Sequence, residues 1–519
     1  MRSQLIRSVG AVGGMTLLSR VTGLVRDIAF AQYLGSGALA DAFFVAFRIP
    51  NFFRRVFGEG AFSVAFVPVF SEYEARYPAR QARAFLDLMA GRLAIVLVFF
   101  SLGGVLAAPV LVGLLAPGFT SDPEKYQITV SMLRLTFPYL FFISLVAMAG
   151  GILNTRERFG AHAATPVLLN LCLIGAVWLV VPHVPDPAIA LGGGVLLAGV
   201  VQLSFQFPFL RQVQRIPRPR LRAATPDQQV GSQGVIQVLR LMLPAVFGVS
   251  IAQINLLINT ILASFLITGS VSWLYYSDRL MEFPLGVFGI ALATVILPTL
   301  SRQIAQSQQE AYRQTLDWAL QLVFLICLPA AAALVVLAFP LMVTLFQYGA
   351  FLASDATMAA DSLRAFALGL VGFVLVKVLA PGFYARKDTR TPVLIGAIAM
   401  IINAVVAVLL VWSLAHVGLA LATSIAGLAN AVLLYRRLVL KTGFALTSGW
   451  GLFLARVILA TLLMSVVLFY GTGNDTTWVL ASVWGRVGKL GLLICAGGLS
   501  YLAILYLSGL QVHRLLGRP

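Results

Sequence analysis

Residues 393–414 read VLIGAIAMIINAVVAVLLVWSL and contain no charged side chain. A helix of about 20 apolar residues spans the hydrocarbon core of a bilayer, so this stretch is long enough to cross a membrane. Residues 93–115 form a second run of the same kind. A membrane-spanning β-strand would instead alternate apolar and polar positions over about 10 residues. The two stretches therefore predict an all-α membrane protein and exclude a β-barrel.

The composition of the 519-residue chain agrees with this prediction. The chain is 60% hydrophobic and 11% charged, whereas soluble proteins carry about 25% charged residues. It has 37 Lys and Arg against 19 Asp and Glu, which gives a net charge of +18. In a soluble protein such a charge would suggest nucleic-acid binding. In a membrane protein its meaning depends on where the cations lie.

Apolar segments recur along the whole chain and predict fourteen transmembrane helices. The loop cations fall on alternate loops, and the other loops contain Lys125 as their one cation. Cytoplasmic loops of membrane proteins are enriched in Lys and Arg. This pattern places both termini in the cytoplasm and explains the net charge without a nucleic-acid partner. The segments are, in approximate bounds, 9–34, 41–70, 89–116, 128–153, 163–182, 188–210, 236–267, 271–300, 317–348, 360–385, 391–413, 417–435, 449–470 and 478–508.

The sequence also repeats itself at an offset of about 230 residues, as in transporters built from parallel repeats. The pattern Val-Pro-x-x-Ser at 67–71 returns as Leu-Pro-x-x-Ser at 297–301, and Thr-Pro-Val-Leu at 165–168 returns at 391–394. These coincidences occur in the same order in both halves. They predict two pseudo-symmetric six-helix bundles with the same orientation.

The repeat divides the chain into four parts. An N-terminal six-helix bundle covers residues 1–210, and a C-terminal six-helix bundle covers 236–440. Residues 211–235, rich in Arg and Pro, predict a cytoplasmic linker between them. Residues 441–519 supply helices 13 and 14, which lie outside the repeat.

Several arginines lie inside the predicted membrane segments, where each would cost about 2.5–3.5 kcal/mol on insertion scales. A cluster of them is tolerable around a water-filled cavity. Arginine binds diphosphates through paired, charge-assisted hydrogen bonds. We therefore expect an anion-binding cavity. Its candidate ligands are Arg20 and Arg26 on helix 1, Arg54 on helix 2 and Arg279 on helix 8.

The same segments contain acidic residues and one lysine that are candidates for the cavity and its gates. Glu59 and Lys377 come from different halves, and we expect one such acid–base pair to act as a gate. Asp27 with Arg279 would serve as well. The full set of gate and cavity candidates is Asp27, Asp41, Glu59, Asp278, Glu282 and Lys377.

Four further cations lie toward helix ends, where a long side chain can reach the interface or an acid. We interpret Arg134, Arg364, Arg486 and Lys489 as structural.

No enzyme motif is present. The sequence lacks a Walker loop, HExxH, GxSxG and any acidic pair of the DDxxD type. Cys172, Cys327 and Cys495 lie in apolar runs without CxxC spacing. We expect a protein that is not an enzyme and that has neither a metal site nor a cofactor.

Four stretches closely resemble the MurJ/MviN family, the lipid II flippases of the multidrug/oligosaccharidyl-lipid/polysaccharide exporter superfamily. They are ADAFFVAF at 40–47, RRVFGEGAF at 54–62, YYSDRLMEFP at 275–284 and VKVLAPGFY at 376–384. The resemblance extends over essentially the whole chain, including the two additional helices.

The resemblance implies transport of lipid II, the undecaprenyl-diphosphate-linked disaccharide-pentapeptide, to the periplasmic leaflet of the bacterial inner membrane during peptidoglycan synthesis. It implies that helices 13 and 14 form a groove for the lipid tail, in a monomer that could meet the cell-wall synthesis machinery. The family's functional arginines match Arg20, Arg26, Arg54 and Arg279, its helix 2 aspartate matches Asp41, and its gate acids match Asp27 and Glu59.

One departure from the family concerns ion coupling. A sodium site in some members uses aspartates on helices 7 and 11, where this chain has Asn255, Asn259 and Asn403. The energy source therefore stays open. Two alternatives also stay open: a multidrug or other polyprenyl-linked glycan exporter of the same superfamily, and a membrane enzyme or scaffold for cell-wall lipids. An exporter of cationic drugs would favour an acidic cavity, which counts against the first alternative. The second alternative, a membrane enzyme, would need a catalytic centre, and the sequence has no candidate for one.

Overall fold

The computed structural model describes the backbone of residues 2–510 and contains helices as its regular elements in that range. Each predicted apolar segment lies on one helix or on consecutive helices, and the all-α fold class is confirmed. Within this range, the structure does not describe the side chains of residues 2–12, 57–59, 247–249, 251–252, 287, 290–291 and 293–294.

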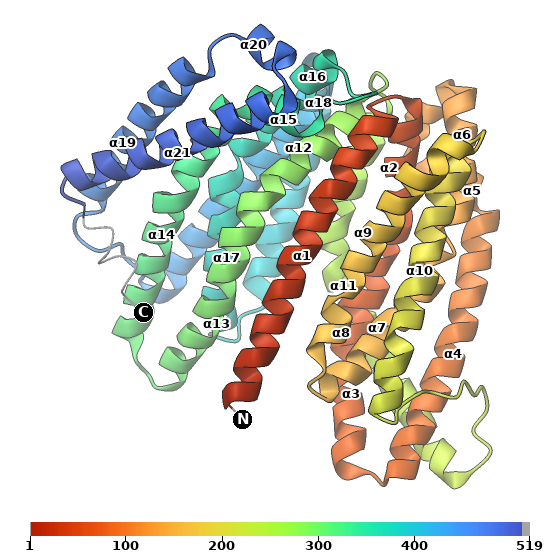
Figure 1. The fold of residues 1–519 in the computed structure, drawn as a ribbon. Coiled ribbons are helices and arrows are strands. Elements are labelled where there is room, and N and C mark those ends of the chain that lie inside the picture. The colour runs from red at the N-terminus through yellow and green to blue at the C-terminus, as the bar shows by residue number, and fades with distance from the viewer. Residues whose placement is uncertain (1, 511–519) are drawn as a thin grey trace. The chain divides into compact units, whose positions relative to one another are not determined.

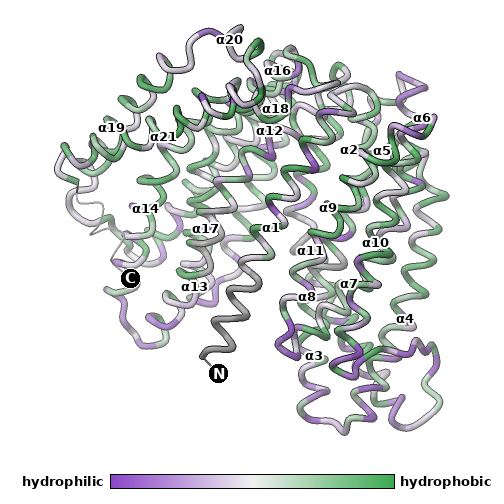
Figure 2. The backbone as a smooth tube through the Cα atoms, viewed as in Figure 1, coloured by the Kyte–Doolittle hydropathy of each residue, from purple (hydrophilic) through white to green (hydrophobic). Residues whose placement is uncertain are grey.

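The chain divides into two compact units, residues 1–268 and 269–519. Figure 1 shows the helices of both units and Figure 2 their hydropathy, with hydrophilic residues gathered at connections such as α3–α4 and α13–α14. The first unit contains α1 (Arg2–Leu34), α2 (Ala38–Phe53), η1 (Arg54–Phe62), α3 (Ser63–Arg76), α4 (Ala79–Leu106), α5 (Ala108–Leu115), η2 (Pro117–Ser121), α6 (Pro123–Thr136), α7 (Tyr139–Thr155), α8 (Phe159–Ala163), α9 (Thr165–Gly175), η3 (Ala176–Val180), η4 (Val181–His183), α10 (Pro187–Gln212) and α11 (Pro226–Ser264).

The second unit contains the remaining helices. Its longest element, α18, is two helices joined at Ala415, whose φ of 48° and ψ of −131° are not helical. The two arms correspond to the predicted segments 391–413 and 417–435. The unit consists of α12 (Ser270–Pro284), η5 (Leu285–Gly289), α13 (Ile290–Ala305), α14 (Gln309–Val336), α15 (Ala338–Phe346), α16 (Ala353–Ala367), α17 (Leu370–Tyr384), α18 (Arg390–Thr442), α19 (Trp450–Thr472), α20 (Asp475–Leu480) and α21 (Val483–Leu507).

Within the described residues, nine helical stretches are long and apolar enough to cross a bilayer, with α18 counted once. The other predicted crossings are α1, α2 with α3, α11, and α12 with α13. The protein is therefore a multi-pass membrane protein, and the count of fourteen crossings stays a prediction.

The internal repeat is visible in the places where helices break. The break between α4 and α5 at Ala107 returns between α14 and α15 at Leu337, an offset of 337 − 107 = 230 residues. The π-helical turns η1 and η5 begin at Arg54 and Leu285, again about 230 residues apart. A proline in the preceding helix, Pro50 or Pro284, removes a backbone donor and disturbs the regular ladder there.

The boundary between the compact units differs from the predicted boundary between the lobes. The sequence predicts that the second six-helix bundle begins at residue 236, whereas the compact units divide after Thr268, so that α11 packs within the first unit; the boundary of the repeat stays a prediction. Close packing against α3 and α4 explains this. A Cβ at Gly234 would lie 2.7 Å from the rings of Tyr73 and Phe85, and the Tyr73 hydroxyl donates to the Val230 carbonyl at 2.7 Å.

The connection between α10 and α11 is shorter and more fixed than the predicted linker 211–235. Helix α11 already begins at Pro226, with a capping box formed by Thr225 and Gln228. Upstream, the Arg218 amide donates to the Asp87 carboxylate on α4 at 2.7 Å, and the Arg220 amide donates to the Asp87 carbonyl at 2.9 Å. These two hydrogen bonds to Asp87 hold the connection against α4 of the first unit.

Helices α19 and α21, which the sequence placed outside the repeat, are held to the second unit at three points. Near the start of α19, the buried Asp317 carboxylate of α14 accepts from the Thr447 hydroxyl and the Trp450 indole, each at 2.7 Å. Along α21, the Tyr501 hydroxyl donates to the Leu325 carbonyl at 2.7 Å. At the start of α21, Arg486 donates to carbonyls at the end of α15. The pair is thus fixed along its length.

The connection between α17 and α18 contains a pH-sensitive contact outside the membrane segments. Asp388 accepts from Lys441 Nζ at 2.7 Å and from the Thr391 amide at 3.0 Å, and these bonds lower its pKa from 3.8 to about 2. A lowered carboxylate pKa stabilises the fold above the unfolded-state pKa. That stability is lost as the pH falls through the folded-state value.

We expect the Lys441→Ala variant to melt at a slightly lower temperature than wild type, with a constant difference from pH 7 to pH 5. The pair is partly exposed, so the difference corresponds to about 0–1 kcal/mol. It should shrink as the pH falls from about 4 toward 2, because Asp388 then becomes protonated. Melting curves of detergent-solubilised protein across this range measure it. A difference that grows on acidification would contradict the assignment.

Candidate functional site

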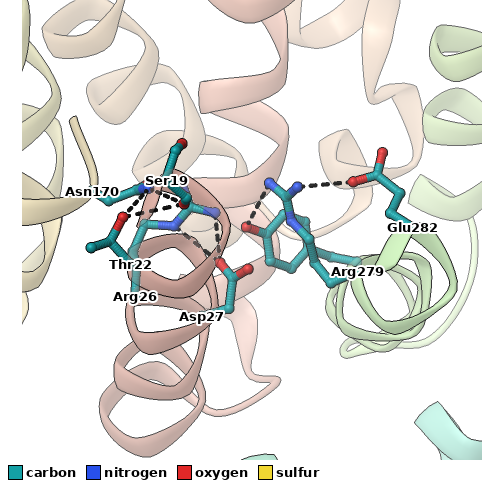
Figure 3. A network of polar contacts seen from close by, with 8 residues as sticks. Ser19, Thr22, Arg26, Asp27, Asn170, Arg279 and Glu282 are labelled. Carbon is teal, nitrogen blue, oxygen red and sulfur yellow. Dashed lines mark hydrogen bonds and ion pairs between the residues drawn. The ribbon is translucent and has the colours of Figure 1, made fainter. Parts of the chain in front are cut away.

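Arg26 on α1 lies in a buried polar network within the first unit (Figure 3). Its Nε and Nη2 donate to one oxygen of Asp27, at 3.0 and 2.7 Å. Its Nη1 donates to Asn170 Oδ1 on α9 at 2.9 Å. Arg26 is 5% exposed and Asp27 is 2% exposed. The guanidinium is therefore charge-neutralised by its neighbour in sequence and fixed by a second helix.

Arg279 on α12 forms a separate network within the second unit (Figure 3). Its Nη1 lies 3.1 Å from Glu282 Oε2, and its Nη2 donates to the Tyr275 hydroxyl at 3.4 Å. The Tyr275 ring lies 5.1 Å from the guanidinium carbon. Residues 275, 279 and 282 share one helix face because they are three and four positions apart. The Arg279 side chain is 37% exposed, unlike Arg26.

The other predicted ligands are placed differently. Arg54 begins the π-helical turn η1, and its Nε donates to Asn51 Oδ1 at 3.0 Å. Arg20 is half-buried on α1. Both arginines belong to the first unit. Their contact with a substrate stays a prediction.

The gate candidates fall into three groups. Asp27 and Glu282 pair with the arginines described above. Asp278 is half-buried on α12, and Lys377 is exposed on α17. The Glu59 side chain lies outside the described residues. The predicted gate pair therefore stays a hypothesis.

Asp41 takes part in a buried ion pair. Lys125 Nζ at the start of α6 lies 2.8 Å from Asp41 Oδ2, and the two side chains are 4% and 1% exposed. The same ammonium group lies 4.2 Å from the centre of the Phe119 ring and 3.4 Å from the Thr268 hydroxyl. Sequence reasoning counted Lys125 as a loop cation. The structure places it inside the first unit, where it neutralises Asp41.

The structural interpretation of the helix-end cations agrees with the contacts. Arg364 pairs with Asp361 at 2.6 Å. Arg486 is 7% exposed and donates to four backbone carbonyls, including Trp478 and Val479 at the end of α20. Backbone carbonyls at helix ends carry partial negative charge, which stabilises a buried guanidinium there.

Of the other two helix-end cations, Lys489 also contacts a backbone carbonyl, whereas Arg134 is exposed. Lys489 donates to the Thr472 carbonyl at 2.9 Å and lies over the Trp478 ring. Arg134 is exposed at the end of α6.

Sequence reasoning did not identify Lys125 and Asn170 as members of these networks. Each contacts its partner across a long stretch of chain, 84 residues for Lys125–Asp41 and 144 for Arg26–Asn170. The sequence does contain a signal for Asn170, because it is a polar residue that interrupts the apolar stretch 165–175.

In both arginine networks, a phosphate group can replace the carboxylate that the guanidinium binds. Each guanidinium already binds a carboxylate oxygen, so a phosphate oxygen can take the same place with the same donors. A phosphate group offers several acceptor oxygens, and guanidinium donates to such oxygens in a fixed planar fork.

Known proteins similar to this chain agree with one another. A family model described as lipid II flippase MurJ matches residues 30–487. A probable lipid II flippase MurJ of Vibrio cholerae is 44% identical, with 99% of this chain and 98% of that protein covered. A lipid II flippase MurJ of Burkholderia cenocepacia is 39% identical, with 98% of both covered.

Solved structures give the same result. A lipid II flippase MurJ in an inward closed conformation matches with a TM-score of 0.79 at 25% identity, covering 98% of this chain and 99% of that one. A multidrug transporter of the MATE family matches with a TM-score of 0.68 at 15% identity, covering 83% of this chain and 98% of that one. The second likeness concerns the fold alone.

Proposed function

This chain belongs to the lipid II flippase MurJ family, and we propose that it moves lipid II from the cytoplasmic to the periplasmic leaflet of the bacterial inner membrane. It is a transporter and not an enzyme. We propose alternating access as the mechanism, with both termini in the cytoplasm and the diphosphate of the substrate bound by arginines. The product serves peptidoglycan synthesis.

The observation that carries this proposal is the Arg26 network. A buried guanidinium inside a membrane protein is costly, and one paired with a carboxylate on the same helix is ready to exchange that partner for another oxyanion. The Arg279–Glu282 pair offers the same exchange in the second unit. A diphosphate ester has oxyanions of the kind that a guanidinium binds.

The additional helices α19 and α21 support a lipid-linked substrate. They are fixed to the second unit by Asp317, Tyr501 and Arg486. A transporter of small drugs has no evident use for such a pair. We propose that these helices accompany the polyprenyl tail while the headgroup is carried.

Transport assays with the full chain in proteoliposomes test the proposed function. We expect a fluorescent lipid II analogue added to one leaflet to reach the other, at a rate above that of protein-free liposomes. A cationic dye should not be transported. Dye transport without lipid II movement would replace the proposal with multidrug export.

We expect collapse of the membrane potential to stop transport and removal of sodium to have no effect. Moving a diphosphate outward is favoured by about 2.3 kcal/mol per charge per 100 mV. The segments 236–267, 391–413 and 417–435 contain no acidic residue, and amides alone bind sodium weakly. Asn259→Ala and Asn403→Ala should therefore retain transport. Transport that follows a sodium gradient without a potential would contradict this.

A further inference from the structure

Asn170 on α9 forms hydrogen bonds with three residues of α1. Its Oδ1 accepts from Arg26 Nη1 at 2.9 Å, and its Nδ2 donates to the Ser19 carbonyl at 3.0 Å and to the Thr22 hydroxyl at 3.1 Å (Figure 3). The side chain is 4% exposed. Three hydrogen-bonding groups of α1 therefore meet at one buried amide.

The partners determine which way the amide points. A guanidinium only donates and a backbone carbonyl only accepts. The opposite orientation would place the Asn170 NH₂ group against the Arg26 donors and its oxygen against the Ser19 carbonyl. The amide oxygen must therefore face Arg26.

The amide also differs from Asp27 in its charge. Asp27 neutralises Arg26, so that pair has no net charge. Asn170 fixes the third guanidinium nitrogen without adding a negative charge. A carboxylate in its place would add a negative charge beside Arg26, and an added negative charge repels an incoming phosphate.

We propose that Asn170 is a positioning residue for the substrate-binding Arg26, and that its neutrality keeps the guanidinium available to a diphosphate. This inference rests on the proposed function. Asn170 orients the guanidinium from a helix other than α1, so the direction of its donors does not depend on the Arg26 rotamer alone. The substrate class that it serves is a diphosphate ester.

Binding of undecaprenyl diphosphate to the full chain in nanodiscs tests the proposal. We expect Asn170→Asp to weaken binding by about tenfold or more, because the new charge opposes the anion. Asn170→Ala should weaken it by a smaller factor, because Arg26 keeps its charge and loses one fixed contact. Asp cannot donate to the Ser19 carbonyl as Asn170 does, so melting temperatures are measured beside the affinities. A purely structural role predicts that each variant loses affinity only as far as it loses stability.

Gln202 provides the matched control. It is also a buried amide of the first unit, but its hydrogen-bond partners are the Tyr139 hydroxyl, which donates to it at 3.2 Å, and the Thr165 carbonyl, to which it donates at 2.7 Å. Gln202→Ala should lower the melting temperature as Asn170→Ala does, but leave the affinity for undecaprenyl diphosphate unchanged.

A double-variant cycle separates positioning from packing. In an Arg26→Ala, Asp27→Asn background, Asn170→Ala should no longer weaken diphosphate binding, because the group that Asn170 positions is missing. Wild-type affinity in Asn170→Asp, or weaker binding by Asn170→Ala than by Asn170→Asp, would overturn the positioning role alone. Absence of binding by the wild type would overturn the proposed function and this inference with it.

Discussion

Arg279→Ala is expected to abolish complementation of a bacterial strain depleted of its own lipid II flippase, while the protein remains in the membrane at normal levels. The side chain is 37% exposed and its ion pair with Glu282 is exposed to a similar extent. Exposed ion pairs contribute about 0–1 kcal/mol, so its loss should hardly change the melting temperature. Loss of function would then reflect a missing phosphate ligand.

Arg364 offers a matched control for this variant. It also lies in the second unit, pairs with an acid three residues away, and has a side chain that is 42% exposed. Arg364→Ala should therefore complement normally. Arg279→Lys should restore function only in part, because an ammonium group cannot reproduce the planar fork of a guanidinium. Equal complementation by Arg279→Ala and Arg364→Ala would remove Arg279 from the site.

The corresponding experiment at Arg26 needs a different design. The sequence suggested that its removal would take a ligand from a solvated cavity, but the structure buries Arg26 beside the buried Asp27. Arg26→Ala would therefore disturb Asp27 as well. Arg26→Lys, and Arg26→Ala combined with Asp27→Asn, separate the loss of a ligand from that disturbance.

Lys125→Met is expected to destabilise the first unit strongly. Removing one partner of a buried ion pair leaves the other charge in a low-dielectric environment, at a cost of about 3–5 kcal/mol. The Asp41 carboxylate is 1% exposed, so water cannot easily replace the ammonium group. We expect a large fall in melting temperature and in the amount of protein recovered from the membrane.

Two further variants decide what Asp41 does. Arg76→Ala removes a cation whose side chain is 75% exposed and should leave stability unchanged. The double variant Asp41→Asn with Lys125→Met removes both buried charges and should recover much of the stability. If it also complements, Asp41 supports the fold and is not a substrate ligand. Normal stability of Lys125→Met alone would show that the pair is not required.

Local patterns in the sequence determined much of this protein. The length of apolar runs such as 393–414 fixes membrane-spanning helices, because the hydrocarbon thickness sets how many residues are needed. The offset of about 230 residues predicted a repeat, and the helix breaks at Ala107 and Leu337 show it. The cost of an arginine in the membrane marked Arg26 and Arg279 as functional candidates.

The tertiary structure alone decided which side chains meet. Helical periodicity fixes contacts three or four residues apart, such as Arg279 with Glu282, but it does not fix which face of one helix packs on another. Lys125 therefore reaches Asp41 across 84 residues, and Asn170 reaches Arg26 across 144. The position of α11 has the same cause, because its glycines allow it to pack closely against α3 and α4. Packing between distant helices made these choices, and no spacing along the chain encodes them.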